Sequence, residues 1–104
     1  MKPIKLDRIR NFLFNIDSPK LYKAVTGKSY DTFMRDGFDS DELIAYLYCG
    51  FRHEDHNLTV EQMHDLLVQY DLNDLLVMLQ DSNIIPKIED EEVKNAQMPN
   101  STEI

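Results

Sequence analysis

The stretch "GFRHEDHNLT", residues 50–59, places two histidines and two carboxylates directly after the only cysteine of the chain. Residues of these types could bind a metal ion, form a nucleophile with its base, or connect two helices. The candidate metal ligands are His53, Asp55, His56 and His64. A zinc site needs three or four ligands in a defined geometry, often thiolates or a His-Glu-x-x-His pair on one helix. This spacing offers neither, so we expect no metal site here.

Cys49 and His53 raise the question of catalysis, because residues four apart on a continuing helix are neighbours. A thiol beside an imidazole can act as a nucleophile, because the imidazole can take the proton of the thiol. However, no glycine-rich turn offers donors for an oxyanion, and no third residue in the sequence is placed to orient the histidine. A free buried thiol is far commoner than a catalytic one. We therefore expect no catalytic residue, no bound cofactor and a protein that is not an enzyme.

A joint between two helices accounts for almost every residue of the stretch. Arg52 and His53 fall in the last turn of one helix, where positive charge complements the helix dipole. Residues 54–57 form a polar reversal, and Leu58 and Thr59 have the spacing of a hydrophobic staple and a capping box. The sequence thus predicts a helix–turn–helix hinge. Its structural residues are Gly50, Arg52, His53, Leu58, Thr59 and Gln62.

Cap signals predict the helices that this hinge must connect. The expected N-caps are Ser18, Ser29, Asp39 or Ser40, Thr59 and Asp71. The helix that begins near Asp41 carries apolar residues over an arc of about 200°, against roughly 100° for an ordinary surface helix. It is therefore predicted to be central and buried, with Ile44 and Tyr48 at the margin of the arc. Gly50 weakens this helix by about 1 kcal/mol relative to alanine, which predicts close backbone packing there.

The fold expected from these signals is mainly α, a small bundle of about four to five helices. In residues 1–16 the apolar side chains alternate, which is compatible with a short N-terminal β-hairpin and, over so few residues, with a short helix as well. That alternation involves Ile4, Leu6, Phe12, Phe14 and Ile16. The helical domain is expected to span residues 1–85. Residues 86–104 form an acidic tail with few large apolar groups, which we expect to be disordered in isolation.

Charge and composition exclude several classes of function. The chain of 104 residues has a net charge of −8. Residues 1–35 hold eight basic side chains and three acids, and residues 36–104 hold three basic side chains and sixteen acids. The total disfavours nucleic-acid binding, because no large positive field is available. There is no membrane span, since about 18 consecutive apolar residues would be needed. A single cysteine forms no internal disulfide, and the default expectation is a cytoplasmic protein.

The hinge is also where the sequence becomes recognisable. "LIAYLYCGFRHEDHNLTVEQMHDLL" resembles the tail assembly chaperones of long, non-contractile-tailed phages and related prophages, which often carry a segment like "LLYAGLRHEDPNLTLEEVGDLL". The matching residues are Leu47, Tyr48, Gly50, Arg52, His53, Glu54, Asp55, Asn57, Leu58, Thr59, Asp65, Leu66 and Leu67. Upstream, "KLDRIRNFLF" and "TGKS" resemble the family's "LDKxRNLRF" and "TGKS". The chain departs from the family at Phe51 and His56, and the tail after Ile85 has no counterpart.

The resemblance implies a non-enzymatic protein of the bacterial host cytoplasm that is absent from the mature virion. Such proteins bind the tape measure protein and keep it soluble until the tail tube polymerises around it; the tail tube protein is the second partner implied. Binding a long helical rod calls for exposed apolar groups on a soluble acidic body. The candidate partner-binding residues are Ile44, Tyr48, Val68, Val77 and Met78. An exposed apolar patch also favours homo-oligomers.

A second class of function remains open on charge alone. The chain is lopsided enough to be a small acidic phage regulatory or inhibitory protein, one that mimics DNA and binds a basic host protein. Salt separates the two interpretations, because raised salt weakens a DNA mimic steeply and weakens apolar binding much less.

Overall fold

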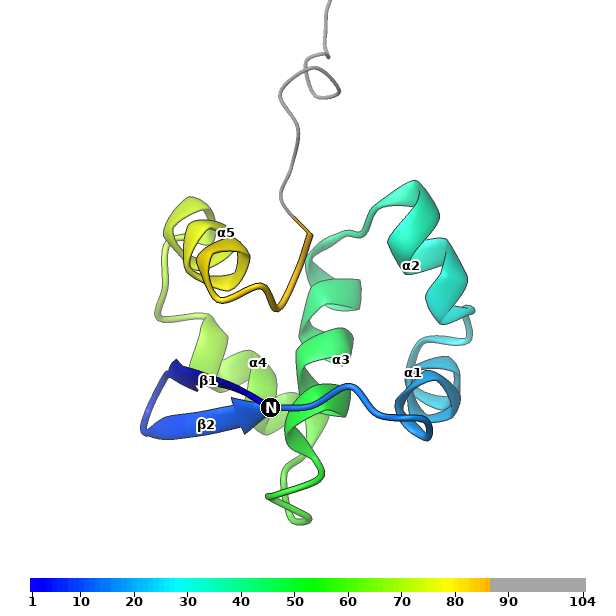
Figure 1. The fold of residues 1–104 in the computed structure, drawn as a ribbon, viewed down its shortest axis with the longest axis horizontal. Coiled ribbons are helices and arrows are strands. Elements are labelled where there is room, and N and C mark those ends of the chain that lie inside the picture. Colours follow the sequence, from blue (N-terminus) through cyan, green and yellow to red (C-terminus); the bar gives the residue numbers. More distant parts are fainter. Residues whose placement is uncertain (87–104) are drawn as a thin grey trace, which may run out of the picture.

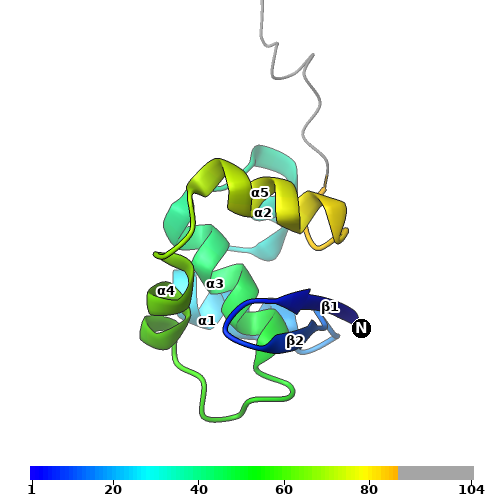
Figure 2. The same cartoon turned by 90° about the vertical axis from the view of Figure 1, so that its left-hand side faces the viewer.

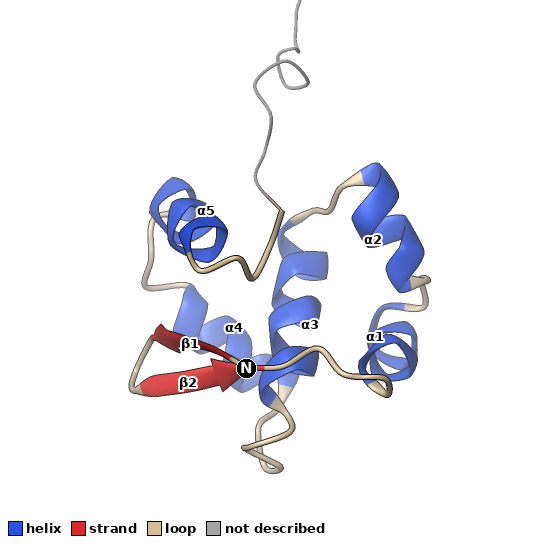
Figure 3. Cartoon of the chain, viewed as in Figure 1, coloured by secondary structure: helices blue, strands red, loops and turns tan. Residues whose placement is uncertain are grey.

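Helix α3 (Ser40–Phe51) stands in the middle of the molecule, and the other elements pack around it (Figure 1). The structure is a computed structural model that describes residues 1–86. On one side of α3 lie α1 (Ser18–Thr26) and α2 (Tyr30–Asp36). On the other side lie a hairpin of β1 (Lys2–Lys5) and β2 (Ile9–Phe12), then α4 (Val60–Leu67) and α5 (Leu72–Asp81). Figure 2 faces this second side, and Figure 3 shows how helix predominates. The predicted mainly-α fold with an N-terminal hairpin is confirmed.

The predicted helix starts are confirmed at Ser29, Asp39, Thr59 and Asp71. Asp39 and Thr59 each complete a capping box with the residue three positions later, Glu42 or Gln62. In both boxes the cap side chain accepts from the backbone N–H of that residue, whose own side chain accepts from the backbone N–H of the cap. Two of the otherwise unpaired donors at each helix start are thereby satisfied.

The prediction for Ser18 is wrong by one residue, since Asp17 occupies the N-cap position of α1 without a side-chain cap bond. The Ser18 hydroxyl is buried and bonds back to Asn15, accepting from its backbone N–H at 2.8 Å. The serine therefore stabilises the turn that leads into the helix rather than its first free N–H groups.

The hairpin packs against α3. The residues on its buried inner face are only partly those of the apolar alternation in the sequence. Its strands pair antiparallel with Ile4 opposite Arg10, and Ile4 and Phe12 are buried as predicted. Arg10 is buried on this inner face too, while Ile9 points outward. Ile16 is exposed, because the strand ends at Phe12 and the chain turns toward α1. The alternation of apolar residues therefore continues in the sequence beyond the end of the strand.

The core surrounds α3 on several sides, as its wide apolar arc predicted. Leu47 and Phe51 are completely buried, and Tyr46 lies among aromatic rings from the hairpin and from α2. The Tyr46 hydroxyl donates to the carbonyl oxygen of Ile84 at 2.7 Å. The segment after α5 therefore packs back onto the central helix, where Ile84 and Ile85 are buried.

Gly50 is the point of closest approach between the hairpin and α3. A Cβ atom built on Gly50 would overlap the ring of Phe12, and the backbone N–H of Leu13 donates to the Gly50 carbonyl oxygen at 2.9 Å. The close backbone packing predicted for this residue is confirmed. The domain predicted over residues 1–85 falls within the described part of the chain, and the acidic tail from residue 87 onward lies outside it.

Candidate functional site

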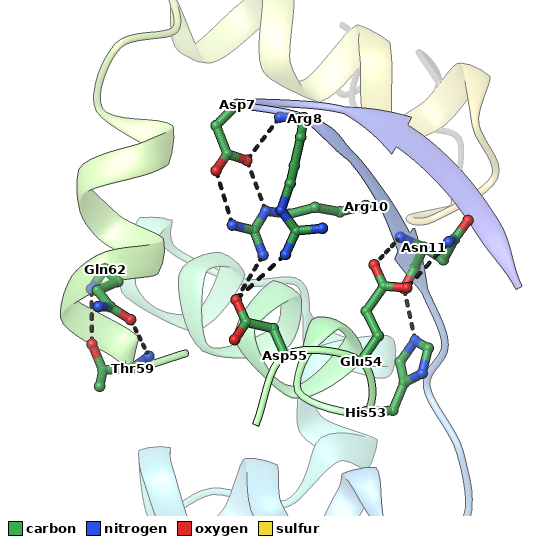
Figure 4. A network of polar contacts seen from close by, with 9 residues as sticks. All are labelled: Asp7, Arg8, Arg10, Asn11, His53, Glu54, Asp55, Thr59 and Gln62. Atoms are coloured by element: carbon green, nitrogen blue, oxygen red, sulfur yellow. Dashed lines mark hydrogen bonds and ion pairs between the residues drawn. The ribbon is translucent and has the colours of Figure 1, made fainter. Parts of the chain in front are cut away.

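The polar residues of the hinge form hydrogen bonds and an ion pair with the N-terminal hairpin (Figure 4). The backbone N–H of Asn11 donates to Glu54 Oε1 at 2.8 Å, and the Asn11 amide donates to Glu54 Oε2 at 3.1 Å. His53 Nε2 lies 2.7 Å from the Asn11 carbonyl oxygen, to which it donates because a carbonyl can only accept. The bonds from Asn11 hold the pKa of Glu54 below its usual value of 4.5. One hairpin residue is thus held at three polar atoms by two successive hinge residues.

Arg10 completes this contact from inside the hairpin. Its guanidinium binds Asp7 through two parallel bonds of 2.8 and 2.9 Å, and it donates to Asp55 Oδ2 at 3.1 Å. The hydrogen bond from Arg10 holds the pKa of Asp7 below its usual value of 3.8. Paired carboxylates allow a guanidinium to be buried at this position of the inner face. We refer to the residues of this network as the hairpin clamp: Asp7, Arg10, Asn11, His53, Glu54 and Asp55.

The structure does not bring the hinge residues together as a nucleophile with its base or as a set of metal ligands. Helix α3 ends at Phe51, so His53 is not one helical turn beyond Cys49 on a continuing helix. The His53 ring is turned to the hairpin instead. Burial raises the pKa of the Cys49 thiol to about 12, which removes the reactive thiolate at neutral pH. Within residues 1–86 no three His, Cys, Asp or Glu side chains are grouped to hold a metal ion.

Cys49 gives a direct test of this environment. A pKa of about 12 instead of the usual 9.0 means roughly 1,000-fold less thiolate at neutral pH. We expect iodoacetamide to label the folded protein at least ~100-fold more slowly than a free thiol, because only thiolate reacts. The same reaction in concentrated urea is the control and should proceed at the rate of a free thiol. Labelling of the folded protein at the free-thiol rate would contradict the burial of this residue.

The remaining hinge residues are structural as well. Leu58 is buried, and Thr59 and Gln62 form the second capping box. Arg52 caps the end of α3 and donates from Nη1 to the Tyr48 hydroxyl, with its guanidinium over the Tyr48 ring at 5.5 Å from the centroid. The predicted connection between two helices is therefore confirmed, but Arg52 and His53 lie beyond the last turn of α3 and not within it as predicted. Tyr48 itself is only 7% exposed, so the expectation that it is open to a partner is wrong.

A groove crosses the N-terminal half of α3 on a different face from the clamp. One hollow of about 500 Å³ lies between the end of α1 and the starts of α3 and α4. A second hollow of about 220 Å³ lies between α3 and the corner that joins α4 to α5. The two hollows share Asp41, Ile44 and His64, so we describe them together as the α3 groove. Its apolar lining consists of Val25, Leu43, Ile44, Ala45, Val60, Leu67, Val68, Leu72 and Leu75.

The groove brings together two of the five predicted partner-binding residues. Ile44 lies at its centre and Val68 at the end beside α5. Val77 is well exposed but lies outside the lining of either hollow. Met78 is half-buried and packed against the core instead of projecting freely. The predicted set therefore divides between the groove, a separate exposed position and the core.

Sequence reasoning missed three exposed apolar residues of the groove: Val25, Val60 and Leu72. Leu72 falls on the apolar stripe of its helix, which predicts an inward position, yet it is more than half exposed. Val60 directly follows a cap, and Val25 lies near the end of the short helix α1. The only sequence signal for them is an apolar side chain at a helix end, where neighbours on all sides are scarce.

The edge of the first hollow is acidic. Its charged residues are Lys28, Asp39, Asp41, Glu42 and Glu61. Lys28 pairs with Glu42 at 2.7 Å, and Asp39 caps α3. Asp41 and Glu61 form no ion pair with any other residue in the described part of the chain. The first hollow is therefore lined by carboxylates as well as by apolar side chains.

No helix within residues 1–86 combines the length and apolarity needed to cross a membrane. Comparison with protein-family models, curated proteins and solved structures found no match to this chain.

Proposed function

We propose that this protein is a phage tail assembly chaperone that binds the tape measure protein through exposed apolar surface on its helices. In this proposal it acts in the bacterial host cytoplasm, keeps the tape measure protein soluble until the tail tube polymerises, and is absent from the finished virion. The observation that carries the proposal is the α3 groove, in which exposed apolar side chains from three helices gather on a strongly acidic protein. A binding protein for an aggregation-prone helical rod needs that combination.

The hairpin clamp adds support to the resemblance on which the proposal rests. One resembling segment contributes Arg10 and Asn11, and the other contributes His53, Glu54 and Asp55. The two segments are separated by some forty residues of chain, yet their polar residues bind each other directly. The residues that carry the resemblance thus lie together in one structural unit, which supports considering the two segments jointly.

Co-expression tests the proposal. The full-length chain is produced together with the tape measure protein of the same phage or prophage, and the soluble fraction of the tape measure protein is measured. We expect that fraction to rise several-fold and the two proteins to copurify. The control is co-expression with an unrelated acidic protein of similar size. A tape measure protein that stays equally insoluble with and without the chain contradicts the proposal.

Salt distinguishes this function from that of an acidic DNA mimic. Apolar contacts are little affected by ionic strength, whereas binding that depends on a field of carboxylates weakens steeply. We expect the copurified complex to persist in high salt. Dissociation at moderate salt, together with capture of a basic host protein, would favour the inhibitory function instead.

A further inference from the structure

We infer that the α3 groove binds a single amphipathic helix whose apolar stripe is flanked by lysine or arginine. This inference rests on the proposed function for the source of that helix, and it specifies the chemistry that the groove selects. The two hollows of the groove have apolar side chains from α1, α3, α4 and the start of α5 in their lining, and Ile44 belongs to both hollows. An apolar groove between helices is a common docking site for an amphipathic helix.

The charge of the partner follows from the residues at the edge of the groove. Four carboxylates and one lysine line the first hollow, and the lysine is already paired with Glu42. Asp41 lies where the two hollows join, and Glu61 lies on α4 at the opposite wall. With no ion pair among the described residues, both carboxylates remain available to cations that flank a bound apolar stripe.

The same charges argue against two other occupants. The chain's own residues 87–104 hold five acids and two lysines, so their charge does not complement the carboxylates of the groove. A second copy would bring an equally acidic groove face to face, with like charges opposed. A partner with basic flanks is the occupant that the observed charges favour.

Two peptides test the inference. Both are helices of ~18 residues, about five turns, with the same leucine stripe, and one carries lysine flanks while the other carries glutamate flanks. Binding to the full-length protein is measured by fluorescence anisotropy. We expect the lysine peptide to bind at least about ten-fold more tightly than the glutamate peptide. Equal affinities, or tighter binding of the glutamate peptide, would overturn the inference.

Val68→Asp and Val77→Asp provide a matched pair of variants. Both valines are exposed, by 66% and 55%, but only Val68 lines the groove. Each substitution adds one negative charge, which by itself favours a cationic peptide. A loss of binding in Val68→Asp therefore reports lost apolar contact. We expect at least a five-fold weaker affinity for the lysine peptide in Val68→Asp, and less than a two-fold change in Val77→Asp.

Further measurements distinguish a loss of peptide binding from a loss of folding, and test the part that the carboxylates play. Circular dichroism and thermal unfolding should be the same for both variants, because both positions are exposed. Asp41→Asn with Glu61→Gln should reduce the preference for the lysine peptide to less than about three-fold. Equal effects of the two valine variants would overturn the inference, as would dimers of the chain that form through Val68 and exclude the peptide.

Co-expression of the same two variants separates this inference from the proposed function. If Val68→Asp loses the lysine peptide and also fails to solubilise the tape measure protein, the inference is supported. If Val68→Asp solubilises it as well as the unaltered chain does, the groove inference fails while the chaperone function stands. If the unaltered chain binds the lysine peptide but leaves the tape measure protein insoluble, the groove is supported and the proposed function fails.

Discussion

We expect the double substitution Asp7→Ala/Asp55→Ala to lower the free energy of unfolding by about 3–5 kcal/mol, because it leaves a buried guanidinium unpaired. The Arg10 side chain is only 6% exposed, and these two carboxylates are its ion-pair partners within residues 1–86. Removal of the arginine should lower the free energy of unfolding by less. In Arg10→Met the freed carboxylates are 39% and 26% exposed, so they regain water, and we expect a loss of about 2 kcal/mol. Urea denaturation at neutral pH measures both values.

Arg35 provides the matched control, since it also binds two aspartates, Asp31 and Asp36, but all three side chains are exposed. Asp31→Ala/Asp36→Ala removes the same number and type of charges. We expect it to leave the urea midpoint nearly unchanged, as for most exposed ion pairs. Equal destabilisation of the two double variants would mean that the burial of Arg10 has no energetic consequence.

The same network predicts how stability depends on pH. Asp7 has its pKa lowered on folding, so its contribution is present above the usual value of 3.8 and is lost as the pH falls through the lower folded value. Glu54 acts in the same direction below 4.5. When the free energy of unfolding is measured by urea denaturation at several pH values, its loss toward acid pH should therefore be less steep in Arg10→Met than in the unaltered chain.

Gly50→Ala should destabilise the protein by about 2 kcal/mol, although alanine is the better helix former by about 1 kcal/mol. The reason is the overlap between the added Cβ and the ring of Phe12. That ring is packed against Tyr46 and Phe51, with centroids 5.1 and 5.4 Å away, so a shift that relieves the overlap would disturb these contacts. Thermal and urea unfolding of Gly50→Ala measure the effect.

A second background isolates the contribution of this clash. Phe12→Val removes all three ring atoms that lie nearest the added Cβ and keeps a residue suited to a strand. In that background we expect Gly50→Ala to become stabilising, by up to about 1 kcal/mol, because only its helix propensity remains. An equal loss in both backgrounds would show that contact with Phe12 is not the reason for glycine at this position.

The hinge shows which features local sequence patterns can predict and which they cannot. Caps and capping boxes join residues two or three positions apart, so Ser29, Asp39, Thr59 and Asp71 could be recognised in the sequence. His53 was predicted to lie in the last turn of the helix, and that prediction is wrong, because α3 ends at Phe51 and His53 binds the hairpin instead. Its partner could not be predicted, because Asn11 is 42 residues away and only the docking of the hairpin brings the two together.

The candidate site divides in the same way. Ile44 and Val68 were predicted from helical projection, and both line the groove. The same projection suggested Tyr48 and Met78, which the structure covers with Arg52 and with the core respectively. A projection gives the direction of a side chain from its own helix, but not which other element occupies that direction.

Local patterns in the sequence were enough to predict the helical class of the protein, the N-caps of α2, α3, α4 and α5, and a connection between α3 and α4. These depend on interactions within a few residues, which have similar energies wherever the chain goes. Three features depend on contacts between distant segments: the burial of Arg10, the hydrogen bonds between the hinge and the hairpin, and the groove with its carboxylates across α3. Those features depend on which distant surfaces meet, because burial is a property of the neighbours a residue acquires and not of the residue alone.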